Sequence, residues 1–326
     1  MNTSSWFRRI DDLLADSDVT DLCINGAQGI FVDRGTGMQS DTIQGTGASI
    51  PSEPELKNWT LEQLSRAGKS WDAKHPFVDA TLPSGHRLHV AFPPVARNGI
   101  LVSLRRLPTC SSTSGSRRWH QSEALYSQLV KIVRNHESLL ISGATGTGKT
   151  TLASDLLSEV DPRERIIALE DTPELAPAHP HFLSLISRTA NSDGAGEVTL
   201  RTLLRQTLRM RPDRLILGEC RGPEVLELLQ SLNTGHQGAM ATLHANSPRE
   251  ALKRIELLCL LAGNGQLTSL AIRELLALGL QWVVQMKRHE GVRRISEIWK
   301  LEGREGDTLL MRKIELNGAK TGTLAT

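Results

Sequence analysis

The chain has 326 residues, enough for two ordinary domains, and its hydrophobic (39%) and charged (23%) fractions are those of a folded globular protein. The formal net charge is only +2, so overall charge gives no reason to expect a nucleic-acid partner. The amino-terminal sequence lacks the apolar core of a signal peptide, and no stretch reaches the ~18 apolar residues of a membrane span. These features predict a cytoplasmic protein that is peripheral to a membrane only through protein partners.

The four cysteines stand far apart in the sequence, without a C-x-x-C pair. Cys23, Cys110, Cys220 and Cys259 therefore fit neither a zinc site nor a disulfide framework. We expect a reducing compartment and no structural zinc.

The first 108 residues predict a small α+β domain, because short apolar runs are interrupted there by Gly and Pro. The tract 35–52 is rich in Gly, Ser and Thr and predicts loops. Strands are expected at 29–34, 86–92 and 99–106, and helices near 6–15 and 60–70.

A Ser-, Thr- and Gly-rich stretch, 108–116, is typical of a linker. The expected domains are therefore 1–108 and 122–326, joined by a linker at 109–121.

The second domain predicts α/β structure, because helices and continuously apolar strands alternate along it. Such strands are expected where helices cover both faces of a parallel sheet. The expected helices are 122–135, 149–159, 199–209 and 223–233, and the strands are 138–142, 165–170, 214–219 and 239–244. Two more helices (248–262 and 267–279) and two closing strands (282–288 and 293–301) follow.

The sequence GATGTGKT at 143–150 matches G-x-x-x-x-G-K-[ST], with an apolar strand before it and a helix after it. Its glycines let backbone N–H groups surround phosphate oxygens, Lys149 supplies a charge between the β- and γ-phosphates, and the Thr150 hydroxyl suits Mg²⁺. The alternative is a glycine turn that matches by chance. No N-K-x-D sequence occurs, which favours ATP over GTP. The expected ATP-binding residues are Gly143, Ala144, Thr145, Gly146, Thr147, Gly148, Lys149, Thr150 and Thr151.

Acidic residues follow two of the predicted strands: Glu170 and Asp171 in LEDTPE, and Glu219 in RLILGE. In a doubly wound sheet, ligands lie at the carboxyl ends of strands, so these carboxylates are placed to orient water and Mg²⁺. Glu219 has the position of a general base or water-orienting group. Either acid could instead cap the next helix, and for Asp171 that alternative stays open.

Two histidines flank a predicted strand in TGHQGAMATLHANSP, residues 234–248. His236 and His244 are candidates to sense the γ-phosphate, because imidazole can donate a hydrogen bond to an anion. A role as ordinary core or surface histidines stays open as well.

The ordered motifs GATGTGKTT, LEDTPE, LRMRPDRLILGECRGPE and TGHQGAMATLHANSP resemble the Walker A, Asp box, Walker B and His box of the secretion ATPase superfamily, which serves type II and type IV secretion and type IV pili. LLADSDVTDLCING, HPFVDATLPSGHRLHV, SPREALKRIELL and AIRELLALGLQWVVQMKR most closely resemble the Tad (Flp) pilus-assembly ATPases.

This resemblance implies an N-terminal nucleotide-clamping domain before a RecA-like P-loop domain, and a homohexamer that binds ATP and Mg²⁺ where the domains meet. It implies that Glu219 is catalytic, that Glu170 assists, and that arginines clamp the phosphates. The matching arginines are Arg87, Arg105, Arg209 and Arg221.

The function expected from the resemblance is an ATP-hydrolysing motor that acts on an inner-membrane platform protein in Tad or type IV pilus assembly or in protein secretion. The alternative is a type IV secretion or conjugation ATPase involved in DNA transfer, whose length this chain approaches more closely. A second, non-enzymatic alternative is a ring that binds ATP without turnover.

Overall fold

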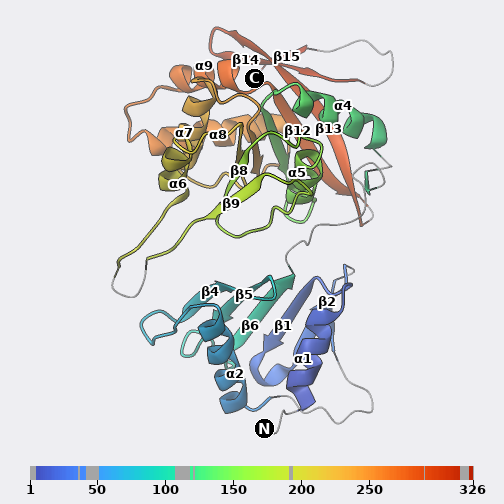
Figure 1. The fold of residues 1–326 in the computed structure, drawn as a ribbon, viewed down its shortest axis with the longest axis vertical. Helices are drawn as coiled ribbons and strands as arrows, with labels where there is room; N and C mark the ends of the chain where they lie inside the picture. The colour runs from blue at the N-terminus through green and yellow to red at the C-terminus, as the bar shows by residue number, and fades with distance from the viewer. Residues whose placement is uncertain are drawn as a thin grey trace. The chain divides into compact units, whose positions relative to one another are not determined.

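The computed structural model describes residues 5–35, 37–41, 51–106, 118–119, 122–190, 194–289, 291–315 and 323–325. The chain forms two compact units, Met1–Leu107 and Pro108–Thr326, which are described separately below (Figure 1). Most of the predicted linker, 109–121, lies outside the described residues. No helix within the described ranges has both the length and the apolar character needed to cross a bilayer.

The N-terminal unit is a six-stranded antiparallel sheet with two helices on one face (Figure 1). Along the sheet the strand order is β3-β2-β1-β6-β5-β4. The strands are β1 (Asp21–Asn25), β2 (Ile30–Asp33), β3 (Met38–Ser40), β4 (Phe77–Thr81), β5 (His86–Ala91) and β6 (Leu101–Arg106); the helices are α1 (Ser5–Ala15), α2 (Glu53–Arg66) and the short 3₁₀ helix η1 (Gly26–Gln28).

The core of this unit lies between the helices and one face of the sheet. Trp6 and Ile10 of α1 and Leu56 of α2 are buried with alternate residues of the strands, such as Leu88 and Val90. Because successive side chains of a strand point to opposite faces, the other face is left to polar residues.

Helix α2 differs from the helix expected near 60–70. It begins at Glu53 because Ser52 and Glu55 form a capping box, in which the Ser52 N–H donates to Glu55 Oε2 at 3.0 Å. Pro54 is compatible with this first turn, since its missing N–H has no intrahelical partner there. The predicted bounds are therefore wrong at both ends. The strand β3 also falls in the tract 35–52, which was expected to be loops.

The C-terminal unit is a nine-stranded mixed sheet with the order β15-β14-β13-β12-β7-β11-β10-β8-β9. The six strands β12, β7, β11, β10, β8 and β9 run parallel to one another. The pairs β12–β13, β13–β14 and β14–β15 are antiparallel. The bounds are β7 (Leu139–Gly143), β8 (Ile166–Glu170), β9 (Phe182–Ile186), β10 (Arg214–Leu217), β11 (Met240–Leu243), β12 (Trp282–His289), β13 (Val292–Glu305), β14 (Thr308–Lys313) and β15 (Thr323–Ala325). The expected α/β class with a parallel-rich sheet is confirmed.

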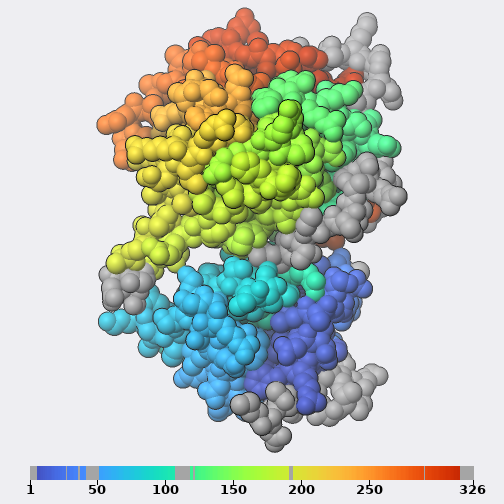
Figure 2. Space-filling view, in the orientation of Figure 1, coloured from blue at the N-terminus to red at the C-terminus, as the bar shows by residue number. Residues whose placement is uncertain are grey.

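Helices cover both faces of this sheet, and each face has its own hydrophobic core. In β8, Ile167 and Leu169 pack on one side, and Ile166 and Ala168 on the other. The two-sided burial explains the continuously apolar strands. The helices are α4 (Glu123–Arg134) and α5 (Lys149–Leu157) on one face, and α6 (Leu200–Thr207), α7 (Glu224–Leu232), α8 (Pro248–Ala262) and α9 (Ser269–Gly279) on the other. Figure 2 shows part of this unit's surface, where the green, lime and yellow segments form a continuous packed face.

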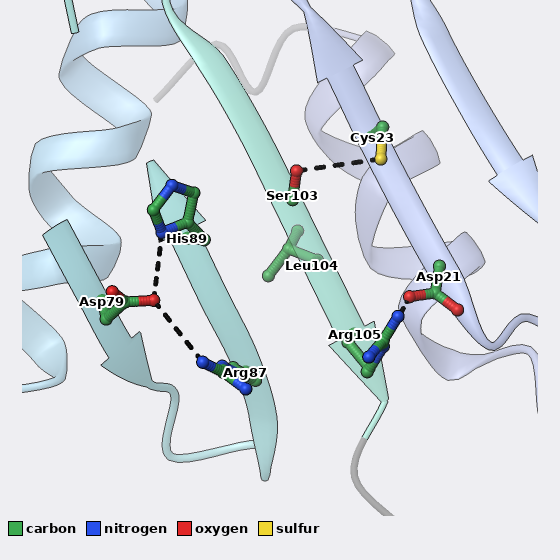
Figure 3. Close-up of a pocket in the computed structure, with 8 residues that line it drawn as sticks. All are labelled: Asp21, Cys23, Asp79, Arg87, His89, Ser103, Leu104 and Arg105. Carbon is green, nitrogen blue, oxygen red and sulfur yellow. Dashed lines mark hydrogen bonds and ion pairs between the residues drawn. The ribbon is translucent and has the colours of Figure 1, made fainter. Parts of the chain in front are cut away.

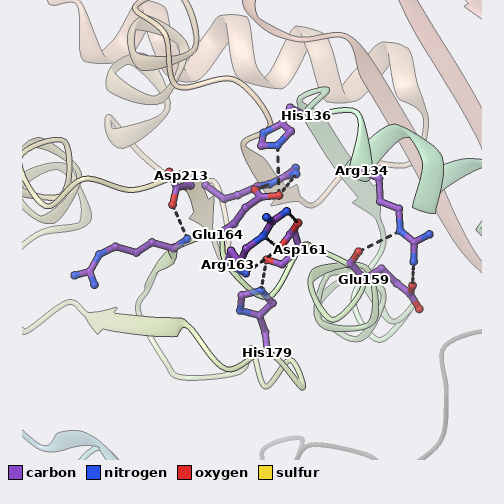
Figure 4. A network of polar contacts seen from close by, with 10 residues as sticks. Arg134, His136, Glu159, Asp161, Arg163, Glu164, His179 and Asp213 are labelled. Atoms are coloured by element: carbon purple, nitrogen blue, oxygen red, sulfur yellow. Dashed lines mark hydrogen bonds and ion pairs between the residues drawn. The ribbon is translucent and has the colours of Figure 1, made fainter.

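A polar network holds the amino ends of the parallel strands (Figure 4). Arg214, the first residue of β10, has a side chain only 1% exposed, and its Nε donates to Glu164 Oε2 at 2.6 Å. His136 Nε2 lies 3.3 Å from the other oxygen of the same carboxylate. This pair joins the turn before β8 to the start of β10. It lies at the amino ends of the parallel strands, whereas the phosphate motif lies at their carboxyl ends.

Candidate active site

The phosphate motif connects the buried strand β7 to the first turn of α5. Gly148 precedes this helix with φ at +93°, a left-handed conformation that favours glycine. The Thr147 hydroxyl donates to the Ala144 carbonyl at 2.8 Å and fixes the loop. Ala144, Thr145 and Gly146 are exposed at its crest. The loop thus presents its backbone at the start of a helix, where N–H groups favour an anion.

Lys149 lies under the loop, with 7% of the residue exposed. Its Nζ donates to the carbonyls of Gly143 at 3.0 Å and Ala144 at 3.1 Å, and it is 3.2 Å from Nδ1 of His244. Burial lowers the pKa of Lys149, and the nearby charges of Glu219 and Glu174 oppose that shift. The ammonium group is therefore held between the loop and the strand-end residues.

His244 connects Lys149 to Glu219. Its Nε2 is 2.8 Å from Glu219 Oε1. Burial, followed by the Lys149 charge, lowers the pKa of His244, so the neutral imidazole is favoured. The partners assign the tautomer: Nε2–H donates to the carboxylate, and Nδ1 accepts from the ammonium group.

Glu219 is also held from its other side. Arg221 Nη2 donates to Glu219 Oε2 at 2.6 Å, and this bond raises the pKa of Arg221. With a donor on each oxygen, the Glu219 carboxylate has a fixed orientation. Glu219, Arg221 and His244 thus lie together, and His244 contacts Lys149 of the phosphate loop.

Gly218, between strand β10 and Glu219, lies where neighbouring strand ends leave no room for a side chain. A Cβ added at Gly218 would lie 2.8 Å from Cγ of Glu170 and 3.3 Å from the Leu169 carbonyl. The Thr242 hydroxyl donates to the Gly218 carbonyl at 2.5 Å. The ends of β8, β10 and β11 are so close here that only glycine fits before Glu219.

Glu170 is buried, with 2% of the residue exposed, and both of its oxygens accept hydrogen bonds. Oε1 accepts from the backbone N–H groups of Glu174 and Leu175 at 2.8 and 2.9 Å, and Oε2 accepts from the Ser184 hydroxyl at 2.7 Å. Burial raises the pKa of Glu170 despite these bonds. These contacts make Glu170 a positioning residue for the turn that carries Glu174.

Glu174 is a site residue that the sequence reasoning missed. The Thr150 hydroxyl donates to its Oε2 at 3.3 Å, so this carboxylate reaches the residue expected to bind Mg²⁺. Oxygen donors of this kind, a hydroxyl and carboxylates, fit a hard divalent cation held partly by substrate phosphates. The available signal was its place as the last residue of LEDTPE.

Three expected site residues are not brought to this cluster. Arg209 is exposed after α6, on the segment leading to the amino end of β10. His236 has a buried Nδ1 without a hydrogen-bond partner among the described residues. Asp171 is exposed and accepts from the Ser187 hydroxyl at 2.7 Å, which is a strand-end contact. The sensing role of His236 and the clamping role of Arg209 stay predictions.

Arg87 and Arg105 are direct cross-strand partners on the polar face of the N-terminal sheet (Figure 3). Each has a carboxylate nearby: Arg105 Nε donates to Asp21 at 2.7 Å, and Arg87 Nη2 lies 3.9 Å from Asp79. These side chains help to line a pocket of about 190 Å³, with Cys23, His89 and Ser103 also on its wall. Like charges placed opposite each other destabilise a sheet, so the pair is suited to an anion. Their role as phosphate clamps stays a prediction.

A strand, a G-x-x-x-x-G-K-[ST] loop and a helix, with carboxylates at neighbouring strand ends, define a P-loop nucleotide-binding protein. Residues 10–289 match the family described as Type II/IV secretion system protein, and the chain belongs to this family.

Relatives by sequence are named for conjugation and type IV secretion. A provisionally named conjugal transfer protein of Mycobacterium tuberculosis strain H37Rv is 38% identical over 306 residues, which are 91% of this chain and 85% of that protein. The conjugal transfer protein TrbB of Rhizobium radiobacter is 30% identical over 89% of this chain and 86% of its own length. The type IV secretion system protein VirB11 of Bartonella henselae is 29% identical over 89% and 90%.

Solved structures agree on the fold. The pilus retraction motor PilT with bound ADP matches with a TM-score of 0.62 and 18% identity, over 98% of this chain and 84% of that one. The ATPase DotB of Legionella pneumophila matches with a TM-score of 0.59 and 20% identity, over 90% and 79%. The sequence relatives support the conjugation and type IV secretion alternative better than the expected closeness to Tad pilus-assembly ATPases.

Proposed function

We propose that this protein hydrolyses ATP to ADP and phosphate as the motor of a type IV secretion or conjugation machine. The observation that carries the proposal is the connection from Lys149 through His244 to Glu219, which joins the phosphate loop to a carboxylate with a donor on each oxygen. The names of the relatives support the choice of machine. Tad pilus assembly, the first expectation, becomes the second candidate because the match named for a pilus, the retraction motor PilT, is a likeness of fold at 18% identity.

In the proposed reaction, backbone N–H groups of the P-loop and Lys149 bind the phosphates. Glu219 orients a water molecule for attack on the γ-phosphate and takes its proton, since both of its oxygens are already oriented by donors. His244 can report the loss of the γ-phosphate, because it touches both Lys149 and Glu219. Thr150 and Glu174 would hold Mg²⁺, which when bound neutralises charge on the phosphates.

We further propose that Arg87, Arg105 and Arg209 bind phosphate oxygens and that the working form is a homohexamer. The motor would act on an inner-membrane platform protein from the cytoplasmic side. Arginines that neutralise a transferring phosphoryl group contribute roughly 10³–10⁵ in rate, which makes Arg105→Ala a sensitive test of this role.

A genetic experiment tests the choice of machine. In cells that make this protein, we expect Lys149→Ala to abolish conjugal transfer of a mobilisable plasmid, with the protein present at wild-type levels. Loss of surface pili with unchanged DNA transfer would instead favour Tad pilus assembly. Wild-type behaviour in both assays would reject the proposed motor.

A further inference from the structure

A basic hairpin lies beside the P-loop, on the side away from His244. In the sheet, β7 lies between β11, which leads to His244, and β12. Strand β12 runs parallel to β7, with Met286 opposite Gly143 at the start of the P-loop. The residues after Met286 therefore extend beyond the carboxyl end of β7, next to the loop. The hairpin 286–294 reads MKRHEGVRR.

Arg293, on the returning strand of this hairpin, packs directly against the P-loop. It is the cross-strand partner of Arg288. A Cβ added at Gly148 would lie 2.9 Å from Cδ of Arg293 and 3.5 Å from the Trp119 ring. Although Arg293 is exposed over the residue as a whole, its aliphatic stem therefore lies on the glycine that begins α5.

The electrostatic surroundings of Arg293 are cationic. Burial, followed by the charges of Arg288 and Arg118, lowers the pKa of its guanidinium. Asp155, the ion-pair partner of Arg118 at 3.7 Å, also accepts from the Trp119 indole at 2.8 Å. Within the described ranges, no hydrogen bond or ion pair involves the Arg293 guanidinium. Gathering three arginines at a phosphate loop is unfavourable unless an anion is bound among them.

The two sides of the P-loop have different chemistry. The His244 side carries Lys149, Glu219 and Arg221, the groups suited to the γ-phosphate and its attacking water. The hairpin side carries Arg293, Arg288 and Arg118 with the Trp119 ring, and Asp155 is already engaged by Arg118 and Trp119. A nucleotide whose γ-phosphate lies toward Glu219 would place its α- and β-phosphates on the Gly148 side.

We propose that Arg293, supported by Arg288 and Arg118, binds the phosphates that ATP and ADP share and is a nucleotide-positioning residue of this site. The proposal rests on the proposed function, since it takes the P-loop to bind ATP. A contact made equally with substrate, transition state and product changes KM and leaves kcat unchanged.

Arg293→Gln tests this role, because glutamine keeps the Cβ and Cγ methylenes and a carbon in the Cδ position and removes the charge. The affinities of the full-length protein for ADP and for ATP would be measured by titration calorimetry, and kcat and KM by phosphate release. We expect ADP and ATP affinity to fall together by about tenfold or more, the typical size of a lost charged hydrogen bond, with kcat within about twofold of wild type. Arg293→Lys should recover part of the loss.

The matched control is Arg312→Gln, which removes the same charge from β14, where Arg312 pairs with Glu302. Wild-type ADP affinity in Arg293→Gln, or a loss confined to kcat, would overturn the proposal. Lys149→Ala distinguishes failure of this proposal from failure of the proposed function. If Lys149→Ala abolishes nucleotide binding and Arg293→Gln leaves it at the wild-type level, the P-loop binds the nucleotide and the proposed role of Arg293 is wrong. If the wild type binds neither nucleotide, both fail.

Discussion

Nε2 of His244 lies 2.8 Å from Oε1 of Glu219, and the same imidazole ring is 3.2 Å from the Lys149 ammonium group. One side chain, favoured in its neutral form, thus accepts from the lysine of the P-loop motif and donates to the candidate catalytic carboxylate. A change in what Lys149 contacts is transmitted to Glu219 through a single ring, which gives a physical basis for coupling phosphate contacts to water activation.

ATP hydrolysis should depend on the protonation of His244. Because its pKa is lowered, the neutral ring is present above its ordinary pKa, and its function is lost as the pH falls through the lowered value. Protonation removes the acceptor for Lys149 and adds a second positive charge. We expect wild-type kcat to fall as the pH drops below about 6.5, the ordinary histidine pKa, and through the lowered pKa of His244.

His244→Gln is the variant that checks this assignment, because glutamine can still accept and donate but does not titrate. We expect about 10- to 100-fold lower kcat at pH 7.5, in line with a weakened hydrogen bond to a charged group, and a flatter acid limb. An acid limb as steep as that of the wild type would show that another group titrates.

Glu170 is expected to act through position rather than chemistry. Glu170→Gln keeps an oxygen for the N–H groups of Glu174 and Leu175, whereas Glu170→Ala leaves both without an acceptor. We expect near-normal turnover in Glu170→Gln and a stability loss of about 1–3 kcal/mol with reduced turnover in Glu170→Ala. Phosphate release and urea unfolding measure the two effects. Loss of turnover in Glu170→Gln as large as in Glu219→Gln would restore the assisting catalytic role.

The raised pKa of Glu170 also predicts a pH trend in stability. The folded protein holds this proton to a higher pH than the unfolded chain, so the free energy of unfolding contributed by this group falls as pH rises above about 4.5 through the raised value. Relative to the wild type, Glu170→Gln should therefore gain stability as pH rises through that interval. A difference that stays constant with pH would contradict the raised pKa.

The buried pair of Arg214 and Glu164 should matter for stability and not for the site. Arg214→Ala removes a buried guanidinium and leaves the half-buried Glu164 without its main partner, so we expect a loss of about 1–3 kcal/mol in urea unfolding. The neighbouring exposed pair supplies the control, since Arg163→Ala removes a side chain that is 89% exposed and should cause no measurable change. Equal effects of the two substitutions would contradict this distinction.

The alternation of helices and strands was predictable because apolar strands and the G-x-x-x-x-G-K-[ST] loop carry local signals. The sequence signal is poor for helices and strands whose position depends on residues that are distant in the chain. Strand β9 was missed because it is an edge strand with several exposed residues. Helix α2 was misplaced because its capping box of Ser52 and Glu55 was not recognised as the start of a helix.

The sequence alone predicts at which strand ends the candidate site lies. Sequence alone placed Glu219 and His244 near the loop, but it could not distinguish the fully engaged Glu170 from Glu174, since both lie in the same six-residue motif. The opposition of Arg87 and Arg105 depends on strand register, and the contact of Arg293 with Gly148 joins residues 145 positions apart. These relationships exist only in the folded chain.

The central claim is that Glu219 activates water for hydrolysis of ATP held by the P-loop. The most direct measurement is Mg²⁺-dependent phosphate release by wild type and Glu219→Gln over a range of protein concentrations, with ATP binding measured in parallel and exposed Glu302→Gln as the control. We expect Glu219→Gln to bind ATP normally and to lose about 10²–10⁴-fold in kcat, and wild-type turnover per chain to rise with concentration if assembly completes the site. Turnover of ATP by Glu219→Gln at the wild-type rate would contradict the account.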